Sequence, residues 1–322
     1  MIPRRSLLAA LAAGCTLPGR AVAQAWPSRI VTLVVPYPPG GSSDISARLA
    51  GDKLSGLLGQ RVIIDNKPGA GGNLGMELVS RAAPDGYTVG LMTTAHAINK
   101  TLFRNPGYDT LTDFEPVAHL TENPLMLVVP PGSPARSVTD LIAMAKARPG
   151  SLNFASSGIG NSPHLTAELF CAMAGIRMTH VPYRGSAPAA ADVVAGHVDL
   201  MFDTTQSVLA QAQDGRLRAL GITSAQRLPN APDIPTIAEA ALPGFVAIAW
   251  NGLVAPRGTP PDVVAKLNTA TIRAMKEPDV ADKLEKLGAV SKPLSPAEFS
   301  AFVRAEVEKW GAVVRQSGAK ID

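Results

Sequence analysis

Cysteine is scarce in this sequence of 322 residues, which contains only Cys15 and Cys171. Cys15 lies in an N-terminal segment that we expect to be cleaved, so a disulfide within the remaining chain is excluded. A metal site built on cysteine is excluded for the same reason. Cys171 stands in an apolar stretch with a helical pattern, and we expect it to be a buried core residue.

Aromatic residues are also few, at 5% of the chain, and no basic stretch carries interleaved aromatic residues. The formal net charge of +4 falls to +1 without the first 25 residues, because Arg4, Arg5 and Arg20 lie there and no acidic residue does. Nucleic acid is therefore excluded as a partner. The hydrophobic content of 46% is typical of a folded chain.

No apolar run reaches the roughly 20 residues that span a bilayer. Residues 1–5 carry positive charge, residues 6–13 are apolar, and Ala23 and Ala25 each end a motif of small residues. This order is typical of a secretory signal peptide, which we place at residues 1–25 with cleavage after Ala23 or Ala25. We therefore expect an exported protein.

Two features of the signal segment leave alternatives open. Arg4-Arg5 weakly resembles a twin-arginine signal, so both the general secretory and the twin-arginine route stay open. Gly14-Cys15 resembles the end of a lipobox, which would place a lipid on Cys15. Ala12 stands where such motifs usually carry leucine, so we favour cleavage over lipid anchoring.

Short β-branched apolar runs alternate with longer helical patterns, which is typical of an α/β fold with parallel sheets covered by helices. The predicted strands are residues 30–35, 62–65, 88–92, 125–129, 153–155, 179–181, 198–202, 217–223 and 248–254. The predicted helices include residues 44–58, residues 137–147 and a long helix opened by the capping box Ser295-Pro296-Ala297-Glu298.

Two segments lie where the chain would cross between lobes. They are residues 125–129, which precede Pro130-Pro131-Gly132, and residues 246–253. A chain that crosses over and returns forms one discontinuous lobe and one continuous lobe. We therefore assign residues 26–126 plus 250–322 to lobe 1 and residues 127–249 to lobe 2.

Loops that follow strands are the expected ligand sites, because open α/β sheets bind ligands beyond the carboxyl ends of their strands. Gly40 and Gly41 let a ligand approach the backbone, and Ser42, Ser43 or Asp44 can cap the next helix. Free N–H groups at that helix start would hold a carboxylate. A stiff turn before a capped helix explains the same residues equally well.

The remaining loops are rich in glycine and hydroxyl groups. Residues 69–75 do not fit a dinucleotide motif, because Leu74 stands where the third glycine belongs. The loop of residues 92–96 again follows a strand, and the serines of residues 156–162 offer neutral hydrogen-bond donors for an anion. No Gly-x-Ser-x-Gly motif accompanies these serines, so a serine nucleophile is not predicted.

Two charged residues follow later strands, and each has two interpretations. Arg184 could pair with a carboxylate or stay solvated, and Asp203 could cap a helix or bind a ligand hydroxyl group, amino group or water. The five histidines form no His-x-x-x-His pair, and no two loop carboxylates form an acid–base pair. We therefore predict no metal site, no cofactor and no catalytic residue.

Seven stretches, in order along the chain, together resemble the Bug family, the extracytoplasmic receptors of tripartite tricarboxylate transporters, also described as TctC-like. They are residues 34–44, 66–73, 84–88, 157–165, 181–185, 196–203 and 232–236. The resemblance covers the chain from about Trp26 to the C-terminus. It implies a type II periplasmic-binding-protein fold, with a ligand cleft between two lobes.

The resemblance also implies a set of ligand-binding residues, carried over position by position. They are Tyr37, Pro39, Gly40, Gly41, Ser42, Asp44, Thr94, Ser157, Asn161, His164, Tyr183, Gly185 and Asp203. The shared loops would grip a carboxylate, partly through backbone amides and ordered waters. They do not decide whether the ligand is a dicarboxylate, a tricarboxylate, an acidic amino acid or an aromatic acid.

By the same resemblance, we expect a monomeric receptor in the periplasm that delivers its ligand to membrane subunits of a tripartite tricarboxylate transporter. A ligand sensor for a signalling system without its own transporter would need the same loops, so that alternative stays open. An enzyme on the same fold is disfavoured, because the loops offer neither a nucleophile with a base nor a metal site.

Overall fold

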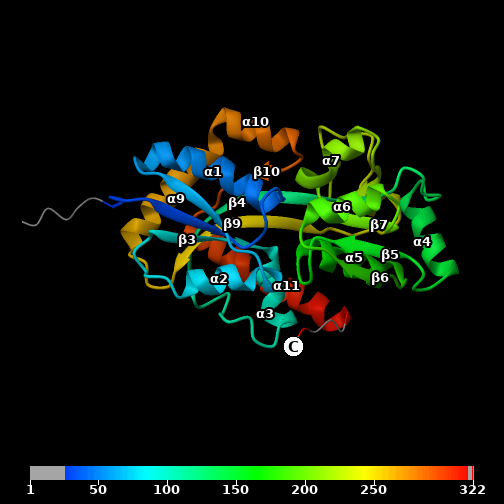
Figure 1. The fold of residues 1–322 in the computed structure, drawn as a ribbon, viewed down its shortest axis with the longest axis horizontal. Coiled ribbons are helices and arrows are strands. Elements are labelled where there is room, and N and C mark those ends of the chain that lie inside the picture. Colours follow the sequence, from blue (N-terminus) through cyan, green and yellow to red (C-terminus); the bar gives the residue numbers. More distant parts are fainter. Residues whose placement is uncertain (1–25, 318–320, 322) are drawn as a thin grey trace, which may run out of the picture.

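A computed structural model describes residues 26–317 and residue 321 of the chain. The predicted signal peptide, residues 1–25, lies outside the described residues. Two lobes lie side by side along the long axis of the molecule (Figure 1). Within the described residues, no helix combines the length and the apolar character needed to cross a membrane.

Strands and helices alternate along most of the chain. The strands are β1 (Val31–Val35), β2 (Val62–Asn66), β3 (Thr88–Thr93), β4 (Phe114–Val129), β5 (Asn153–Ser156), β6 (Thr179–Pro182), β7 (Leu200–Thr204), β8 (Arg218–Ile222), β9 (Ile248–Pro256) and β10 (Val290–Ser291). The helices are α1 (Ser42–Leu58), the 3-10 turn η1 (Ala70–Gly72), α2 (Asn73–Ser80), α3 (Thr94–Leu102), α4 (Val138–Ala147), α5 (Ser162–Ala174), α6 (Ser186–Val194), α7 (Thr205–Gln213), α8 (Ile237–Ala240), α9 (Pro261–Lys276), α10 (Pro278–Lys286) and α11 (Pro296–Ser317).

One long strand, β4, belongs to the sheets of both lobes. From Phe114 to Pro124 it pairs with β9, and from Leu125 onward it pairs with β7 and β8. The sheet of lobe 1 therefore has the order β2-β1-β3-β9-β4, and that of lobe 2 has the order β4-β7-β5-β6 with β8 on the other side of β4. Figure 1 shows β4 and β9 running through the middle of the molecule.

The strand directions bring the binding loops face to face. β9 is antiparallel to both β3 and β4, so β3 and its parallel neighbour β1 run toward lobe 2. β7 is antiparallel to β4 and parallel to β5, so both run toward lobe 1. The carboxyl ends of both sets of strands therefore meet at the boundary between the lobes, where ligands bind in open α/β sheets.

The predicted strands all exist, but the expectation of parallel sheets is wrong for the centre of the molecule. The chain enters lobe 2 along β4 and returns along β9, and this reversal makes the central pair antiparallel. The first half of β4 escaped the sequence analysis because Pro116, Glu122, Asn123 and Pro124 interrupt its apolar pattern.

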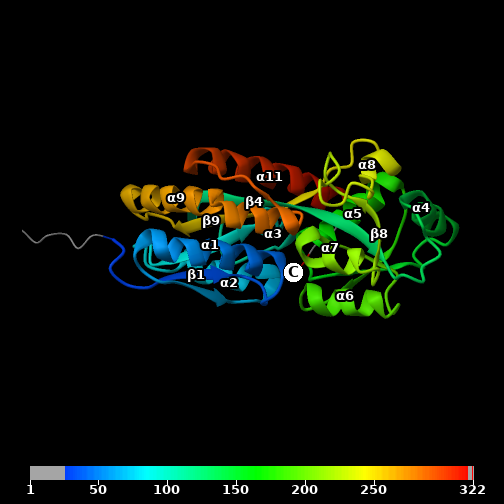
Figure 2. The same cartoon turned by 90° about the horizontal axis from the view of Figure 1, so that it is seen from above.

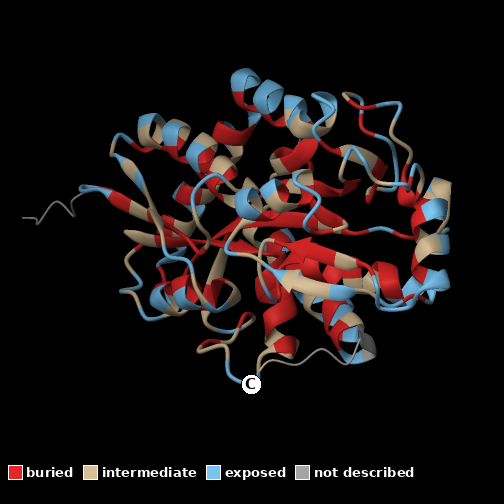
Figure 3. Cartoon of the chain, turned by 45° about the vertical axis from the view of Figure 1, so that its right-hand side comes forward, coloured by how far each residue is buried: buried red, intermediate tan, exposed pale blue. Residues whose placement is uncertain are grey.

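Helices cover the sheets and leave the buried residues in the interior (Figure 3). One core cluster contains residues of both lobes, among them Ile98 of α3, Phe170 of α5 and Trp310 of α11. Cys171 is buried on α5, as predicted. The predicted capping box at α11 is also confirmed: the Ser295 N–H donates to Glu298 Oε2 at 2.9 Å, and the Glu298 N–H donates to Ser295 Oγ at 3.3 Å.

The C-terminal helix α11 is tied to the central strands by one buried carboxylate. Glu306 Oε2 accepts hydrogen bonds from Nε1 of Trp250 on β9 and Nε1 of Trp310 on α11, both at 2.8 Å. Figure 2 shows α11 lying along β4 and β9, and its end reaches α5 of lobe 2. Glu306 thus satisfies two buried indole N–H groups at once.

We expect Glu306→Ala to lower the free energy of unfolding by about 2–4 kcal/mol, because each indole N–H left buried without an acceptor costs about 1–3 kcal/mol. Glu308→Ala is the matched control, because Glu308 lies on the exposed side of the same helix, and it should change stability by less than about 0.5 kcal/mol. Urea denaturation followed by circular dichroism measures both. Equal effects of the two variants would contradict this account of Glu306.

Candidate functional site

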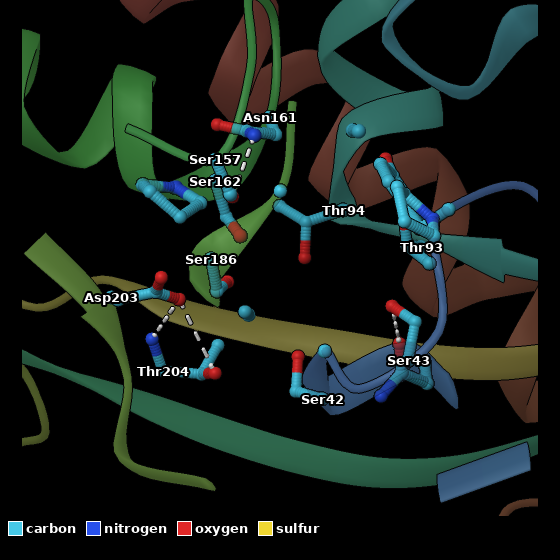
Figure 4. Close-up of a pocket in the computed structure, with 18 of the residues that line it drawn as sticks. Ser42, Ser43, Thr93, Thr94, Ser157, Asn161, Ser162, Ser186, Asp203 and Thr204 are labelled. Carbon is cyan, nitrogen blue, oxygen red and sulfur yellow. Dashed lines mark hydrogen bonds between the residues drawn. The ribbon is translucent and has the colours of Figure 1, made fainter. Parts of the chain in front are cut away.

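A cleft between the lobes holds a cavity of about 700 Å³, its open mouth included. Its walls come from β9 and from the loops after β1, β3, β5, β6 and β7. Eight serine and threonine residues contribute to the lining. Figure 4 shows these serine and threonine residues together with Asn161 and Asp203. The cavity is thus lined by many hydroxyl groups and few charges.

The loop after β1 leads into α1, which starts at the cavity wall. Gly41 precedes the helix and has no side chain to cap it. A Cβ atom at Gly41 would meet no other atom within 4 Å, so the glycine leaves room in the cleft. Ser43 Oγ donates to Asn251 Oδ1 of β9 at 3.1 Å. The first N–H groups of α1, beginning at Ser42, therefore remain available to a ligand.

The loop after β3 places two threonines beside the cavity. The Thr93 N–H donates to His96 Nδ1 at 2.8 Å and closes the first turn of α3. Thr94 Oγ1 accepts from the Trp250 N–H at 2.8 Å, which fixes α3 to β9. The Tyr37 hydroxyl lies 3.3 Å from Thr93 Oγ1. Burial raises the pKa of Tyr37 to about 12, so this phenol stays neutral.

In lobe 2 the loop after β5 is held by Asn161. Its Oδ1 accepts from the His164 N–H at 3.1 Å and caps α5, while its Nδ2 donates to Ser157 Oγ at 2.8 Å. A residue with both a donor and an acceptor is needed for this double task. Ser157 and Ser162 thereby line the cavity next to the start of α5.

The loop after β6 provides another helix start. Gly185 precedes α6 with a φ of 116°, in the left-handed region that favours glycine. The Gly185 N–H donates to the Ser157 carbonyl oxygen at 3.1 Å and joins this loop to the one after β5. Arg184 is exposed and borders the cavity. Within the described residues it is the one lining side chain with a fixed positive charge.

Asp203, at the end of β7, is the one acidic residue that lines the cavity in the described part of the chain. Only 1% of Asp203 is exposed. Its Oδ1 accepts from the Thr204 N–H at 2.7 Å. Burial raises the pKa of Asp203 to about 6, although the nearby Ser186 hydroxyl and the bond from Thr204 act in the opposite direction.

Five helices direct their N-termini at this one cavity: α1 and α3 from lobe 1, and α5, α6 and α7 from lobe 2. Among the described residues, no side chain caps α1, α6 or α7. Unsatisfied N–H groups and aligned peptide dipoles make such helix starts favourable for anions. The arrangement can therefore hold a negatively charged group through neutral donors.

Comparison with known proteins decides the family. The family model described as the tripartite tricarboxylate transporter family receptor, TctC, matches residues 46–319. The chain belongs to this family. A UPF0065 protein from the tcbD–tcbE intergenic region of Pseudomonas sp. (strain P51) is 41% identical, over 97% of this chain and 94% of that protein. Protein BugT of Bordetella pertussis (strain Tohama I) is 36% identical, over 93% of this chain and 92% of that protein. The predicted resemblance to the Bug family is thus confirmed.

Solved structures confirm the fold of the receptor. Rpa4515 of R. palustris, described with adipate, matches with a TM-score of 0.88 at 39% identity, over 92% of this chain and 100% of that chain. MatC of Rhodopseudomonas palustris, described with bound malate, matches with a TM-score of 0.85 at 37% identity, over 90% of this chain and 100% of that chain. The two-lobed periplasmic-binding-protein fold predicted from the sequence is therefore confirmed.

Most of the predicted ligand-binding residues of the receptor lie together in the cleft. Those that line the cavity are Tyr37, Pro39, Gly41, Ser42, Thr94, Ser157, Asn161, Gly185 and Asp203. They come from five separate loops. Their use by a ligand remains a prediction, whereas their proximity is a property of the structure.

Gly40 and Asp44 belong to the same loop but do not line the cavity. Asp44 is buried beneath the loop, where its Oδ2 accepts from the Gly40 N–H at 3.0 Å and from Arg48 Nε at 2.9 Å. Asn66 Nδ2 donates to Asp44 Oδ1 at 3.0 Å. Burial pushes the pKa of Asp44 up, but these bonds outweigh burial and hold the pKa below its usual value. Asp44 therefore shapes the loop from behind.

His164 and Tyr183 also lie outside the cavity lining. His164 Nδ1 accepts from the Gly160 N–H at 3.2 Å, and its ring stacks on His180 at 3.9 Å between centroids. Burial and the neighbouring His180 lower the pKa of His164 to about 3. The Tyr183 hydroxyl donates to Asp192 Oδ2 at 2.6 Å. His164 therefore supports the loop after β5 from behind, whereas Tyr183 borders a neighbouring hollow that shares Tyr37 and Ser157 with the cavity.

Several lining residues stand outside the predicted set. They are Pro38, Ser43, Thr93, Ala95, Ser162, Pro163, Arg184, Ser186, Ala187, Pro188, Thr204, Ala249, Trp250 and Asn251. Thr93 and Thr204 end strands directly before helices, and the rule that found Thr94 and Asp203 would have found them too. Asn251 interrupts an apolar strand, which is a usable signal. The sequence offers no such signal for Trp250, because a tryptophan in an apolar strand is typical of a core residue.

Among the residues that the structure describes, no group of three or more histidine, cysteine, aspartate or glutamate side chains is arranged to hold a metal ion. The donors of the cleft are hydroxyl and amide groups, which suit an anion better than a cation.

We expect Asp203→Asn to stabilise the ligand-free receptor above pH 6. The folded state holds the Asp203 proton up to a pKa of about 6, whereas the unfolded chain releases it near the ordinary value of 3.8. Wild-type stability therefore falls as the pH rises between these values and stays lowered above them. The variant should gain about 2–3 kcal/mol at pH 8 and almost nothing at pH 4.

Chemical denaturation of ligand-stripped protein at pH 4 and pH 8 measures this difference. Asp214→Asn is the control, because Asp214 lies exposed at the other end of α7. A gain of the same size at both pH values would show that ionisation of Asp203 is not its cause.

Proposed function

We propose that this protein is a periplasmic receptor that binds a small carboxylate in its cleft and delivers it to the membrane subunits of a tripartite tricarboxylate transporter. The observation that carries the proposal is the convergence of five helix N-termini on one cavity. Their N–H groups favour an anion. One buried acid and one exposed arginine are the charged residues of the lining within the described chain.

The position and chemistry of the cavity support a small carboxylate. The cavity is lined from both lobes and opens to solvent, as sites for small molecules commonly do. Two carboxylate oxygens accept up to about four hydrogen bonds, and eight hydroxyl residues supply donors around them. The relatives described with adipate and with malate support the same ligand class.

We further propose that residues 26–126 plus 250–322 and residues 127–249 move as the two lobes. Two observations support these boundaries: β4 changes partners between Pro124 and Leu125, and β9 begins at Ile248. A ligand that contacts loops from both sides favours the closed arrangement of the lobes.

We propose that the receptor acts in the periplasm as a monomer. It uses no cofactor and no catalytic residue. The N-terminal pattern of charged, apolar and small residues supports export. The description of the family supports the membrane subunits as partner.

We expect adipate, malate or a related carboxylate to bind, and the corresponding neutral diamide not to bind. Ala187→Asp should weaken carboxylate binding by roughly tenfold to a hundredfold, because it places a negative charge in the cavity wall. Ala187 lines the cavity in the first turn of α6. An acid at that position suits the helix, so the variant should fold.

Isothermal titration calorimetry on ligand-stripped protein measures these affinities. Ala191→Asp is the matched control, because Ala191 lies exposed one turn further along α6 and does not line the cavity. Diamides that bind as tightly as the carboxylates would refute the anion site, and so would equal losses in the two variants.

We expect a saturating carboxylate to make the receptor more compact. The lobes are joined at β4 and β9, and closure about these strands brings the two sets of loops together. Small-angle X-ray scattering should show a smaller radius of gyration with ligand than without it. An unchanged radius with a ligand whose binding calorimetry has established would rule out closure.

A further inference from the structure

One buried oxygen in the cleft makes no hydrogen bond of ordinary geometry. Asp203 Oδ2 has no such bond among the described residues, although Asp203 is only 1% exposed and lines the cavity. The neighbouring Ser186 hydroxyl lies near enough to lower the pKa of the carboxyl group. Oδ1 is already engaged with the Thr204 N–H at 2.7 Å. A buried carboxyl oxygen without a partner is costly, so Oδ2 is an available position for a hydrogen bond with a ligand.

The surroundings make an ionised Asp203 unfavourable once an anion is bound. Helix N-termini and hydroxyl groups line the cavity, and they would donate hydrogen bonds to the ligand carboxylate. A second negative charge at the buried Asp203 would repel the ligand carboxylate at short range. One proton between the two carboxyl groups turns this repulsion into a hydrogen bond.

We propose that Asp203 is protonated in the ligand-bound receptor and donates its Oδ2–H to an oxygen of the bound carboxylate, so that ligand binding takes up one proton. This inference rests on the proposed carboxylate function. The proton comes from solvent and stays on Asp203, while the ligand remains an anion. Asp203 thereby makes affinity depend on pH.

The titration of Asp203 supports the inference. Burial raises its pKa to about 6 in the ligand-free protein, and a bound anion raises it further. At pH 7.5 the free receptor therefore carries mostly ionised Asp203 and must gain a proton on binding. Below pH 5 the proton is already present, and binding should take up almost none.

The other titratable groups near β7 face elsewhere. β5 and α7 carry none, and α6 carries Asp192, which bonds to Tyr183. β4 carries Glu115, His119 and Glu122 in the half that pairs with β9 in lobe 1. These groups lie in positions that do not line the cavity.

Helix α5 carries His164, Glu168 and Cys171. Burial lowers the pKa of His164 to about 3 and raises that of Cys171 to about 12, so neither changes charge between pH 5 and pH 8. Burial also raises the pKa of Glu168, which does not line the cavity. In the cavity wall Tyr37 stays neutral in this range, because burial raises its pKa to about 12. Glu168 is therefore the acid to use as a control.

The test is calorimetry with adipate and with malate in buffers of different ionisation enthalpy. Wild type should take up about one proton per ligand at pH 7.5, and its affinity should fall about tenfold per pH unit above pH 6.5. Asp203→Asn should take up almost none and should bind at pH 8 at least as tightly as wild type, because its amide donates in place of the O–H. Glu168→Gln should behave as wild type.

Each alternative result has a definite meaning. Wild-type binding without proton uptake overturns the inference, and this holds even if Asp203→Asn fails to fold. Loss of affinity in Asp203→Asn at every pH also overturns it, because Asp203 would then act as an acceptor for a donor on the ligand. If adipate and malate give no binding heat in any buffer, the proposed carboxylate function itself fails for these probes.

Discussion

The pairing of one strand with two sets of partners determines the geometry of this receptor. β4 pairs with β9 in lobe 1 and with β7 and β8 in lobe 2. Because β4 keeps one direction throughout, the parallel strands of the two lobes must run toward each other. Every loop that follows such a strand then opens onto the same boundary, and every helix that follows such a loop starts there. The cleft is a consequence of this strand order.

The same geometry concentrates unsatisfied backbone donors. α1 and α6 start after glycines, and no side chain caps α7 among the described residues. N–H groups without partners cost stability where water is scarce, and a bound anion would recover that loss. Asp203 adds a single acid to this collection of donors, which moderates the positive potential of the empty cleft. Under the proposed function, the uncapped helix starts lower the stability of the ligand-free protein and raise its affinity for an anion.

Local patterns in the sequence were sufficient to predict the strands that end at the cleft, because glycines and hydroxyl residues directly follow apolar runs. The loops that carry Ser157 and Asp203 were found in this way, and the family resemblance added Thr94. The first half of β4 could not be found, because its pairing with β9 lets prolines and polar residues occupy a strand. The supporting role of Asp44 was equally hidden, since Asn66 lies 22 positions further along the chain.

The directions of the His164 and Tyr183 side chains also could not be predicted from the sequence. Their loops were correctly expected at the cleft, but the direction of each side chain depends on His180 and Asp192, which belong to neighbouring elements. A motif places a residue within a loop. The packing behind the loop decides whether its side chain reaches the ligand or supports the loop.

The shared carboxylate of Glu306 has an optical consequence. The protein has three tryptophans, and two of them, Trp250 and Trp310, donate to the same Glu306 oxygen. Trp250 also borders the cleft. The indole of Trp250 packs against Phe299 and Phe302 of α11 and donates to Glu306, so its emission should respond to changes in the packing of that helix. Trp250 is therefore an intrinsic fluorophore at the border of the cleft, coupled to the helix that packs on β4 and reaches α5 of lobe 2.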